Sequence, residues 1–453
     1  MLKLKSKQLI LFFGDLFFAA IALYLALVLR FFDVPSKERM IAHLEIFIPL
    51  FLLFVVMYYS FDFYDFSSFQ SKLKQFSRVI NIHVFVAVIG LGYFYLFSSY
   101  YGGLTPKTVL ALYTAIHIII SVLWRLFIVP LFLRPAARTK TLLIAEGDEY
   151  EELKRTVNGH TFYPFFFTSH LRVSAEDISS EENSLSMLRR ILEENHITQV
   201  VADIRDQNVA ALLPYLYNLA SQHKVHVFDA ALVYQDVLKK MPMRGIGHFW
   251  FFESVQLDIQ LYEALKRLID ILLALPLLVV WTLLHPFVYL AIRLDSKGDA
   301  FIAQERYGSG GKVIKLYKYR TMTFSDKGKW LKDKDNKNKV TKVGYWLRKT
   351  RIDELPQLLA ILQGDLSFIG PRPDIVALGG QLSAQIPYYM MRYTVRPGLS
   401  GWAQVNQDVP PQSLEETKVR LQYDLYYVKN RSFFLDFIIM VKTFKVLVLR
   451  TGM

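Results

Sequence analysis

Four long apolar stretches fill the first third of the chain. Each approaches the ~20 residues that an α-helix needs to cross the hydrocarbon core of a membrane. They cover roughly residues 8–29, 46–64, 79–97 and 109–133. Asp15 interrupts the first stretch and no small-residue cleavage site follows it, so we expect the segment to be retained rather than removed as a signal peptide. The pattern predicts a membrane protein with four transmembrane helices within residues 1–135.

A few polar side chains fall inside these stretches. Lipid disfavours such groups, so they either bond between helices, snorkel toward the membrane surface, or line a path for a lipid. We expect bonding between helices or snorkelling for this set, which comprises Asp15, His83, His117 and Arg125.

Basic residues flank the apolar stretches unevenly, and short loops rich in lysine and arginine stay in the cytoplasm. The basic flanks are Lys3, Lys5 and Lys7 before the first stretch, Lys72, Lys74 and Arg78 between the second and third, and Arg134, Arg138 and Lys140 after the fourth. The two opposite loops also carry Lys37, Arg39 and Lys107, so the bias is moderate. We expect the chain after Lys140 to be cytoplasmic.

Residues 136–255 show a different pattern, in which short β-prone runs alternate with polar segments of helical length. The runs are TLLIA, FYPFFFT, ITQVVAD and KVHVFD. This alternation predicts an α/β module with a parallel sheet. A dinucleotide-binding fold has a glycine-rich turn after its first strand, but here that strand leads into Glu146, Gly147, Asp148 and Glu149. We therefore interpret the module as a degenerate Rossmann-like domain used for packing or regulation.

A fifth apolar stretch covers about residues 265–292 and contains Pro276 and Pro286. Interior prolines remove helix hydrogen bonds and cause kinks. Polar sequence of cytoplasmic character lies on both sides, so a helix that enters the membrane, breaks and returns fits better than one that crosses. The alternative, a fifth full span, would put the C-terminal third outside the cell.

Composition narrows the chemistry. The chain has 453 residues, of which 53% are hydrophobic, and a formal net charge of +13, so anionic partners are favoured. Nucleic acid, acidic lipid head groups and phosphorylated substrates all fit that charge. There are no cysteines, which excludes disulfides, thiolate zinc sites and cysteine nucleophiles.

The candidate chemistry lies in RIDELPQLLAILQGDLSFIGPRPD, which runs from Arg351 to Asp374. Its neighbouring carboxylates, Asp353 and Glu354, would be about 100° apart on a helix, but at a helix start both can reach one ion or phosphate. Five cations that suit phosphate recur around them, several beside proline or glycine turns. These cations are Lys318, Arg320, Arg348, Arg372 and Arg396. Together they predict a phosphate site.

The region 256–453 resembles the catalytic domain of the bacterial sugar transferases, also called monotopic phosphoglycosyl transferases or polyprenyl-phosphate hexose-1-phosphate transferases. The matching pieces, in the family's order, are KRLID, AIRLDSKGDAFIAQERYGSGGK, KLYKYRTM, LRKTRIDELPQLLAILQGDLSFIGPRPD and VRPGLSGWAQVN. Four membrane helices followed by an α/β module look like the large members of this family. The expected fold is a four-helix bundle, the degenerate module and a mainly helical catalytic domain with the re-entrant helix.

The resemblance implies a two-step reaction. Asp353 attacks the sugar-bearing phosphate of a UDP-sugar, expels UMP and becomes a phosphosugar ester. A polyprenyl phosphate, typically undecaprenyl phosphate, then takes the sugar phosphate, in the first membrane step of exopolysaccharide, capsule or O-antigen (lipopolysaccharide) assembly. Family members need Mg²⁺, which Asp353 and Glu354 would bind, with Glu354 alternatively accepting a proton. The implied location is the bacterial inner membrane, with lipid but no nucleic acid as a partner and a homodimer as a possible assembly.

Matching positions extend the implied site. Lys318, Arg320, Arg348 and Arg372 correspond to cations that bind phosphate, and Arg396 and Gln404 lie in the VRPGLSGWAQVN motif as further substrate-binding positions. The break of the re-entrant helix would fall at His285 and Pro286, where the family often has serine before the proline. Pro276 is a second possible break.

Two rival functions are weaker. A membrane-bound nucleotide-sugar dehydratase or epimerase needs a glycine-rich NAD turn and a tyrosine with a lysine four residues later, and Tyr150 with Lys154 comes too soon after the first strand. A non-catalytic scaffold that binds nucleotide sugars would not need Asp353, Glu354 and their surrounding arginines together.

Overall fold

The computed structural model describes residues 2–61, 63–64, 72–97, 99–100, 107–133, 137–171, 181–222, 225–244, 260–323, 339–407 and 409–449. Contacts divide the chain into two compact units, Met1–Leu238 and Lys239–Met453. The predicted domain boundaries at 135/136 and 255/256 both lie outside the described residues.

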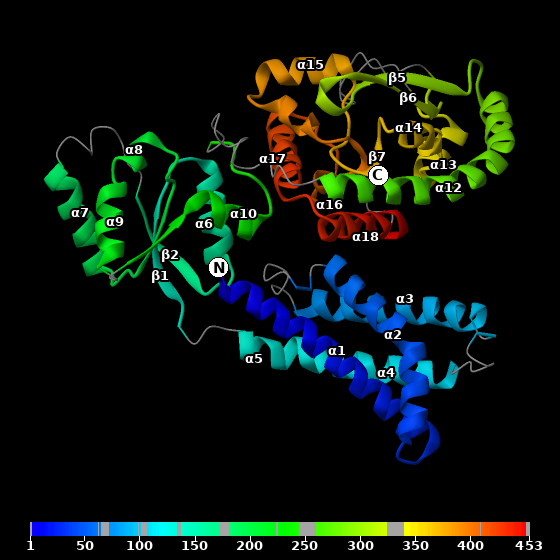
Figure 1. Cartoon of the computed structure of the whole chain (residues 1–453), viewed down its shortest axis with the longest axis horizontal. Helices are drawn as coiled ribbons and strands as arrows, with labels where there is room; N and C mark the ends of the chain where they lie inside the picture. The colour runs from blue at the N-terminus through cyan, green and yellow to red at the C-terminus, as the bar shows by residue number, and fades with distance from the viewer. Residues whose placement is uncertain are drawn as a thin grey trace. The chain divides into compact units, whose positions relative to one another are not determined.

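Long apolar helices form the N-terminal part of the first unit (Figure 1). They are α1 (Leu2–Phe31), α2 (Lys37–Ser60), α3 (Lys72–Leu96) and α4 (Lys107–Leu123), which continues as a π-helical turn η2 (Trp124–Ile128) and α5 (Val129–Leu133). By length and composition, four segments of these helices could each cross a membrane. α4 packs against both α1 and α3. The predicted apolar helices are therefore confirmed, and the chain has the character of a membrane protein.

Asp15 and Arg125 form a buried ion pair between α1 and the π-helical turn. Asp15 also accepts hydrogen bonds from the Tyr64 hydroxyl at 2.8 Å and the Trp124 indole at 3.1 Å. Arg125 donates in addition to the Phe63 carbonyl at 2.7 Å. Because each polar group has a partner within the bundle, the expected bonding between helices is confirmed at this pair.

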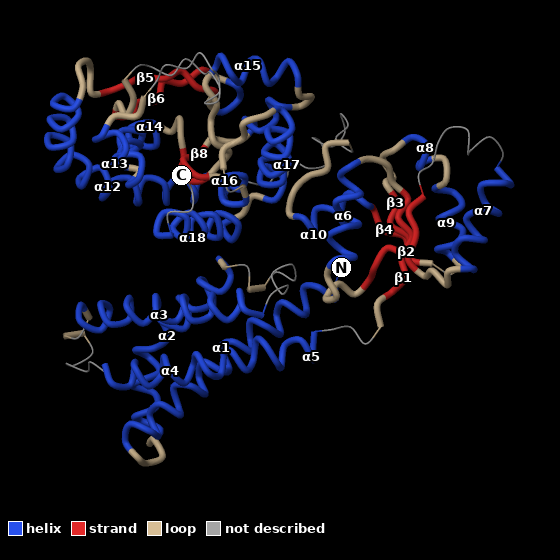
Figure 2. Tube along the Cα trace, turned by 180° about the vertical axis from the view of Figure 1, so that it is seen from behind, coloured by secondary structure: helices blue, strands red, loops and turns tan. Residues whose placement is uncertain are grey.

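The α/β module has one parallel sheet in the order β2-β1-β3-β4. Its strands are β1 (Thr139–Ile144), β2 (Phe165–Leu171), β3 (Gln199–Ala202) and β4 (His226–Asp229). Its helices are α6 (Asp148–Gly159), α7 (Glu181–Glu194), α8 (Gln207–Ala210), α9 (Leu213–Ser221) and α10 (Ala230–Leu238). One apolar core joins α7 and α9 to the sheet and another joins α6 and α10 to its other face, as Figures 1 and 2 show. The predicted parallel α/β module is confirmed.

The turn after β1 is acidic. Gly147, with φ at 116°, precedes α6, whose first turn carries Asp148, Glu149 and Glu151. Carboxylates at a helix N-terminus compensate the helix dipole themselves and repel an incoming phosphate. The arrangement supports the interpretation of the module as degenerate.

The described residues of the second unit form mainly helices and two small sheets. Its elements are α12 (Gln260–Asp295), β5 (Phe301–Tyr307), η3 (Ser309–Gly311), β6 (Val313–Tyr319), α13 (Lys342–Thr350), η4 (Ile352–Gln357), α14 (Leu358–Gln363), β7 (Ser367–Ile369), α15 (Val376–Gln385), η5 (Tyr389–Thr394), β8 (Gly398–Ser400), α16 (Trp402–Asn406), α17 (Leu414–Asn430) and α18 (Phe433–Leu449). β5 and β6 are antiparallel, and β7 and β8 are parallel.

α12 is assigned as one helix through Pro276 and Pro286, and it changes direction toward its C-terminal end (Figures 1 and 2). Its composition also qualifies it as a membrane span. Near its start, Asp270 accepts a hydrogen bond from the Ser367 hydroxyl, and at its end Asp295 accepts one from the amide of Val343 at 2.9 Å. Both ends of this apolar helix therefore attach to the same compact unit.

The expected break lies beside an aromatic contact. The His285 ring is 2.7 Å from the Tyr319 hydroxyl through Nδ1, and it stacks on Phe301 and Tyr319. The indole of Trp281 donates to the same hydroxyl at 3.0 Å. These contacts connect the segment around Pro286 to the β5–β6 hairpin.

Candidate active site

The acidic pair lies in the first turn of the 3-10 helix η4. Arg351 adopts a left-handed conformation with φ at 58°, which ends α13 and starts η4. η4 packs against β6, so Asp353 is only 8% exposed. A backbone reversal and a strand thus place both predicted carboxylates in a protein-lined site.

Glu354 is paired with a predicted phosphate-binding residue. Nη2 of Arg372 donates to Oε1 of Glu354 at 2.5 Å, and Nη1 of Arg351 lies 3.8 Å from the same oxygen. Burial raises the pKa of Glu354, but the charge and hydrogen bond of Arg372 outweigh it and lower that pKa below its ordinary value. Glu354 therefore remains ionised at neutral pH.

Asp353 has a different environment. Burial, and then the charge of Glu354, raise the pKa of Asp353 to about 6, against the opposing effects of Lys318, Arg351 and Arg348. Its Oδ1 atom is buried and has no hydrogen-bond partner among the described residues. A carboxylate that ionises near neutral pH and keeps an unused lone pair suits a covalent nucleophile.

Three of the predicted cations gather around this pair. Burial, and then the positive charges of Arg306, Arg372 and Arg348, lower the pKa of Lys318 on β6 to about 8. Arg348, in the last turn of α13, contacts the Met322 sulfur at 3.4 Å. Lys318, Arg348 and Arg372 are thus close enough to influence one another, as an anion site requires.

Arg306 belongs to this cluster but was missed by the sequence analysis. Its Nη1 donates to the Pro373 carbonyl at 2.5 Å and its Nη2 to the Gln304 side chain at 2.9 Å. Burial and the neighbouring charge of Arg372 lower the pKa of Arg306 to about 10. Side chains alternate along a strand, so Gln304 and Arg306 lie on the same face of β5 as Ile302, the residue that pairs with Lys318 on β6. This alternation was the signal for Arg306 that the sequence offered.

A second group of side chains that the sequence analysis missed fixes the Pro-Arg-Pro loop. Asp374 accepts bonds from Arg392 and Arg420 and from the hydroxyls of Tyr389 and Tyr393, both at 2.7 Å. Burial opposes ionisation of Asp374, but the two guanidinium groups hold its pKa well below the ordinary value. The loop that carries Arg372 is therefore anchored directly beyond that residue.

The same loop needs a close backbone approach. A Cβ atom at Gly398 would collide with the backbone of Gly370, and one at Gly370 would collide with the Arg396 carbonyl. Only glycine at these positions lets β7 and β8 pair so closely. This contact sets the course of the chain into Pro371 and Arg372.

The other predicted site residues lie in different surroundings. Arg320 donates to the Lys297 carbonyl at 2.5 Å and the Ser296 carbonyl at 2.8 Å, so its guanidinium binds the loop after α12. Nη1 of Arg396 is 3.9 Å from Asp270 on α12. The Gln404 amide donates to the Leu399 carbonyl at 3.2 Å.

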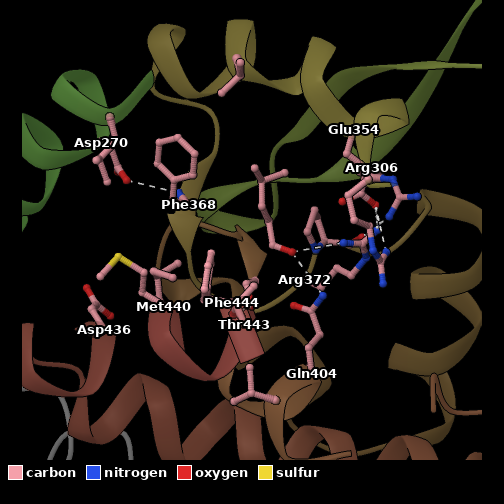
Figure 3. A pocket seen from close by; sticks show the side chains of 18 of the residues that line it. Asp270, Arg306, Glu354, Phe368, Arg372, Gln404, Asp436, Met440, Thr443 and Phe444 are labelled. Atoms are coloured by element: carbon pink, nitrogen blue, oxygen red, sulfur yellow. Dashed lines mark hydrogen bonds and ion pairs between the residues drawn. The ribbon is translucent and has the colours of Figure 1, made fainter. Parts of the chain in front are cut away.

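A cavity of about 1210 Å³ opens beside the acidic pair. Its polar end is lined by Arg306, Arg351, Glu354, Arg372, Asp374, Gln404 and Arg420. Figure 3 shows Glu354, Arg306 and Arg372 gathered on one side, with Asp270, Asp436 and Met440 on the other. Asp353, Lys318 and Arg348 are not among the lining residues, although Asp353 directly precedes Glu354.

Within the described part of the chain, no group of three or more His, Asp or Glu side chains could bind a metal ion. Mg²⁺ commonly uses only one or two carboxylates and completes its shell with water and substrate phosphates. The unpartnered Oδ1 of Asp353 fits that mode, and Glu354 is the adjacent carboxylate.

Comparisons with known proteins match this unit. The family model described as "Bacterial sugar transferase" matches residues 261–450. The chain is 34% identical to the UDP-N-acetylgalactosamine-undecaprenyl-phosphate N-acetylgalactosaminephosphotransferase of Aeromonas hydrophila, over 56% of this chain and 59% of the relative. It is 39% identical to the UDP-glucose:undecaprenyl-phosphate glucose-1-phosphate transferase of Escherichia coli, over 40% of each chain. An uncharacterised sugar transferase of Bacillus subtilis is 38% identical, over 42% of this chain and 89% of the relative. The matches thus span 59% and 40% of the first two relatives.

Proposed function

The chain belongs to the bacterial sugar transferase family, and from this we propose that it transfers a sugar 1-phosphate from a UDP-sugar to a polyprenyl phosphate and releases UMP. The relatives named above act on UDP-sugars and undecaprenyl phosphate. The observation that carries the proposal is the buried, unpartnered Oδ1 of Asp353 beside Glu354 and a group of cations.

We propose a covalent first step. Oδ1 of Asp353 attacks the phosphorus that bears the sugar, the bond between that phosphorus and the bridging oxygen breaks, and the oxygen leaves with UMP. A phosphosugar ester remains on Asp353. An oxygen of the polyprenyl phosphate then attacks the same phosphorus, which forms the lipid diphosphosugar and returns Asp353 as a carboxylate. Because the transfer is divided into two steps, two bulky substrates can use one site in turn.

The surrounding charges support this chemistry. Arg372, Lys318 and Arg348 supply positive charge where phosphate oxygens would lie, and such preorganised charge stabilises a phosphoryl-transfer transition state. Glu354 stays ionised and bound to Arg372. Asp353 and Glu354 would hold Mg²⁺ together with substrate phosphate, and the ion when bound would neutralise phosphate charge.

We propose that the protein lies in the bacterial cytoplasmic membrane with the α/β module and the catalytic unit on the cytoplasmic side. The basic flanks of the apolar helices support this orientation. α12 would enter the membrane and return, with the bend near His285 and Pro286, because both of its ends attach to one unit. The degenerate module is a candidate surface for homodimerisation.

UMP release tests the proposal. Purified full-length protein with Mg²⁺, undecaprenyl phosphate and a panel of UDP-sugars should release UMP with at least one donor. Asp353→Asn should abolish release, and mass spectrometry should find a sugar-phosphate adduct on Asp353 of the unaltered protein. Asp299→Asn, at an exposed position of the same unit, is the control and should keep full activity. UMP release that survives Asp353→Asn would overturn the mechanism, and donor binding without UMP release would favour a scaffold.

A further inference from the structure

Two helices line the cavity with one apolar face each. On α12 these residues are Ile269, Leu273 and Leu277, spaced four apart, and on α18 they are Phe433, Phe437, Met440 and Phe444. This spacing places each set along one stripe of its helix. All seven side chains are between 40% and 52% exposed. We call this part of the cavity the α12–α18 groove.

The carboxylates on the floor of the groove have partners in the protein. Asp436 accepts bonds from Lys266 at 2.7 Å and from the hydroxyls of Tyr262 and Tyr427, both at 2.8 Å. Asp270 accepts bonds from the Ser367 hydroxyl at 3.1 Å and the Phe368 amide at 3.2 Å. Both bonds of Asp270 go to its Oδ1 atom, whereas its buried Oδ2 has no hydrogen-bond partner among the described residues and lies 3.9 Å from Nη1 of Arg396. Asp436 and one oxygen of Asp270 are thus bonded within the protein, so an apolar ligand in the groove would not have to strip these atoms of water.

The α12–α18 groove is continuous with the polar end of the same cavity (Figure 3). That end presents the guanidinium groups of Arg306, Arg351, Arg372 and Arg420, partly balanced by Glu354 and Asp374. The cavity volume, about 1210 Å³, exceeds the roughly 300–1,000 Å³ of ordinary small-molecule sites. A ligand that matches both ends has an anionic head and a long apolar chain.

We propose that the α12–α18 groove binds the isoprenoid chain of the phosphate acceptor, with the acceptor's phosphate at the Arg306–Arg372 end. The proposal rests on the proposed function and adds the location and chemistry of the acceptor site. A terminal phosphate monoester carries up to two negative charges and suits several guanidinium groups. A membrane phospholipid offers a singly charged diester, which has less negative charge for these guanidinium groups and carries a further head group on its phosphate.

Kinetics of groove variants test the proposal. Leu273→Trp would fill the groove and should raise the KM for undecaprenyl phosphate by roughly tenfold, while the KM for the UDP-sugar and the UMP formed without acceptor stay unchanged. Phe437→Ala should act in the same direction by removing a wall. Leu272→Trp, on the neighbouring face of α12 and 58% exposed, is the control and should leave both KM values unchanged. An unchanged acceptor KM in Leu273→Trp and Phe437→Ala, or an equal rise in Leu272→Trp, would overturn the groove assignment.

A labelling experiment separates the acceptor from ordinary lipid. A photoreactive polyprenyl phosphate should label peptides of α12 and α18, and excess undecaprenyl phosphate should suppress the label. Suppression by phosphatidylglycerol to the same extent would show general lipid binding and contradict the proposal. Wild-type UMP release reports separately on the proposed function, so failure of the groove and failure of the reaction give different results.

Discussion

Nη2 of Arg372 donates to Oε1 of Glu354 at 2.5 Å. Glu354 has this cation as a partner and the adjacent Asp353 does not, and the pKa values of the two carboxyl groups are shifted in opposite directions. The pKa of Glu354 is lowered by its cation, whereas burial and the charge of Glu354 raise the pKa of Asp353 to about 6. Neighbouring carboxyl groups whose pKa values are pushed apart can take different roles in one reaction. Glu354 is the permanent negative charge and Asp353 is the group free to react.

Arg372→Gln should therefore impair both activity and stability. It leaves Glu354 buried without its closest cation and removes a phosphate ligand, so we expect UMP release to fall by roughly 10²–10³-fold and the melting temperature to decrease. Arg351→Gln removes a cation that is 3.8 Å away and 45% exposed, and exposed pairs contribute little, so its losses should be much smaller. Equal losses in the two variants would contradict the special role of Arg372.

The pH dependence should follow Asp353. A nucleophilic carboxylate must be ionised to react. The kcat/KM of UMP release for the UDP-sugar should therefore fall about tenfold per pH unit as the pH drops below about 6. Lys318→Gln removes a charge that favours ionisation, so it should move this acid limb to higher pH. Lys315→Gln, at an exposed position on the same strand, should not move it. An acid limb near pH 4 would show that Asp353 does not control the rate.

Arg306 should contribute to donor binding. Loss of one charge-assisted contact costs about 1.5–3 kcal/mol, so Arg306→Gln should raise the KM for the UDP-sugar by roughly 10- to 150-fold, with partial rescue by Arg306→Lys. Isothermal titration with the donor gives the same comparison without turnover. If Arg306 only supports the Pro373 carbonyl, kcat and the melting temperature will fall while donor affinity stays constant.

Local sequence signals were sufficient for the elements of the fold. The lengths of the apolar stretches predicted α1 to α4, and β-prone runs predicted the four strands that the structure describes in the α/β module. These predictions succeed because a span or a buried strand is recognisable from its own residues. The acidic pair and its neighbours Lys318, Arg348 and Arg372 were found from motifs.

Side-chain partnerships across the fold were not predictable in this way. Arg320 and Arg306 are both arginines near short strands, yet one binds carbonyl groups after α12 and the other lines the cavity. Asp374 acquires its partners from η5 and α17, far along the chain. The direction of an arginine depends on tertiary packing, which a motif without strand register does not specify.

Arg320→Gln tests this difference between the two arginines. It removes the bonds to the Ser296 and Lys297 carbonyls, so the melting temperature should decrease while the KM for the UDP-sugar stays unchanged. Gly298→Ala should act alike, because Gly298 has φ at 116° and an added methyl group would collide with the Arg320 guanidinium. A raised donor KM in Arg320→Gln with normal stability would instead support the phosphate-binding role expected from the sequence.

The buried pair of Asp15 and Arg125 should stabilise the membrane helices as a coupled unit. Asp15→Asn or Arg125→Gln leaves one buried charge without its partner, and breaking such a pair costs about 3–5 kcal/mol. The double variant Asp15→Asn/Arg125→Gln removes both charges, so its loss should be smaller than the sum of the single losses. Thermal unfolding of the full-length protein in nanodiscs measures all three variants. Strictly additive losses would mean that the two side chains act independently despite their hydrogen bonds.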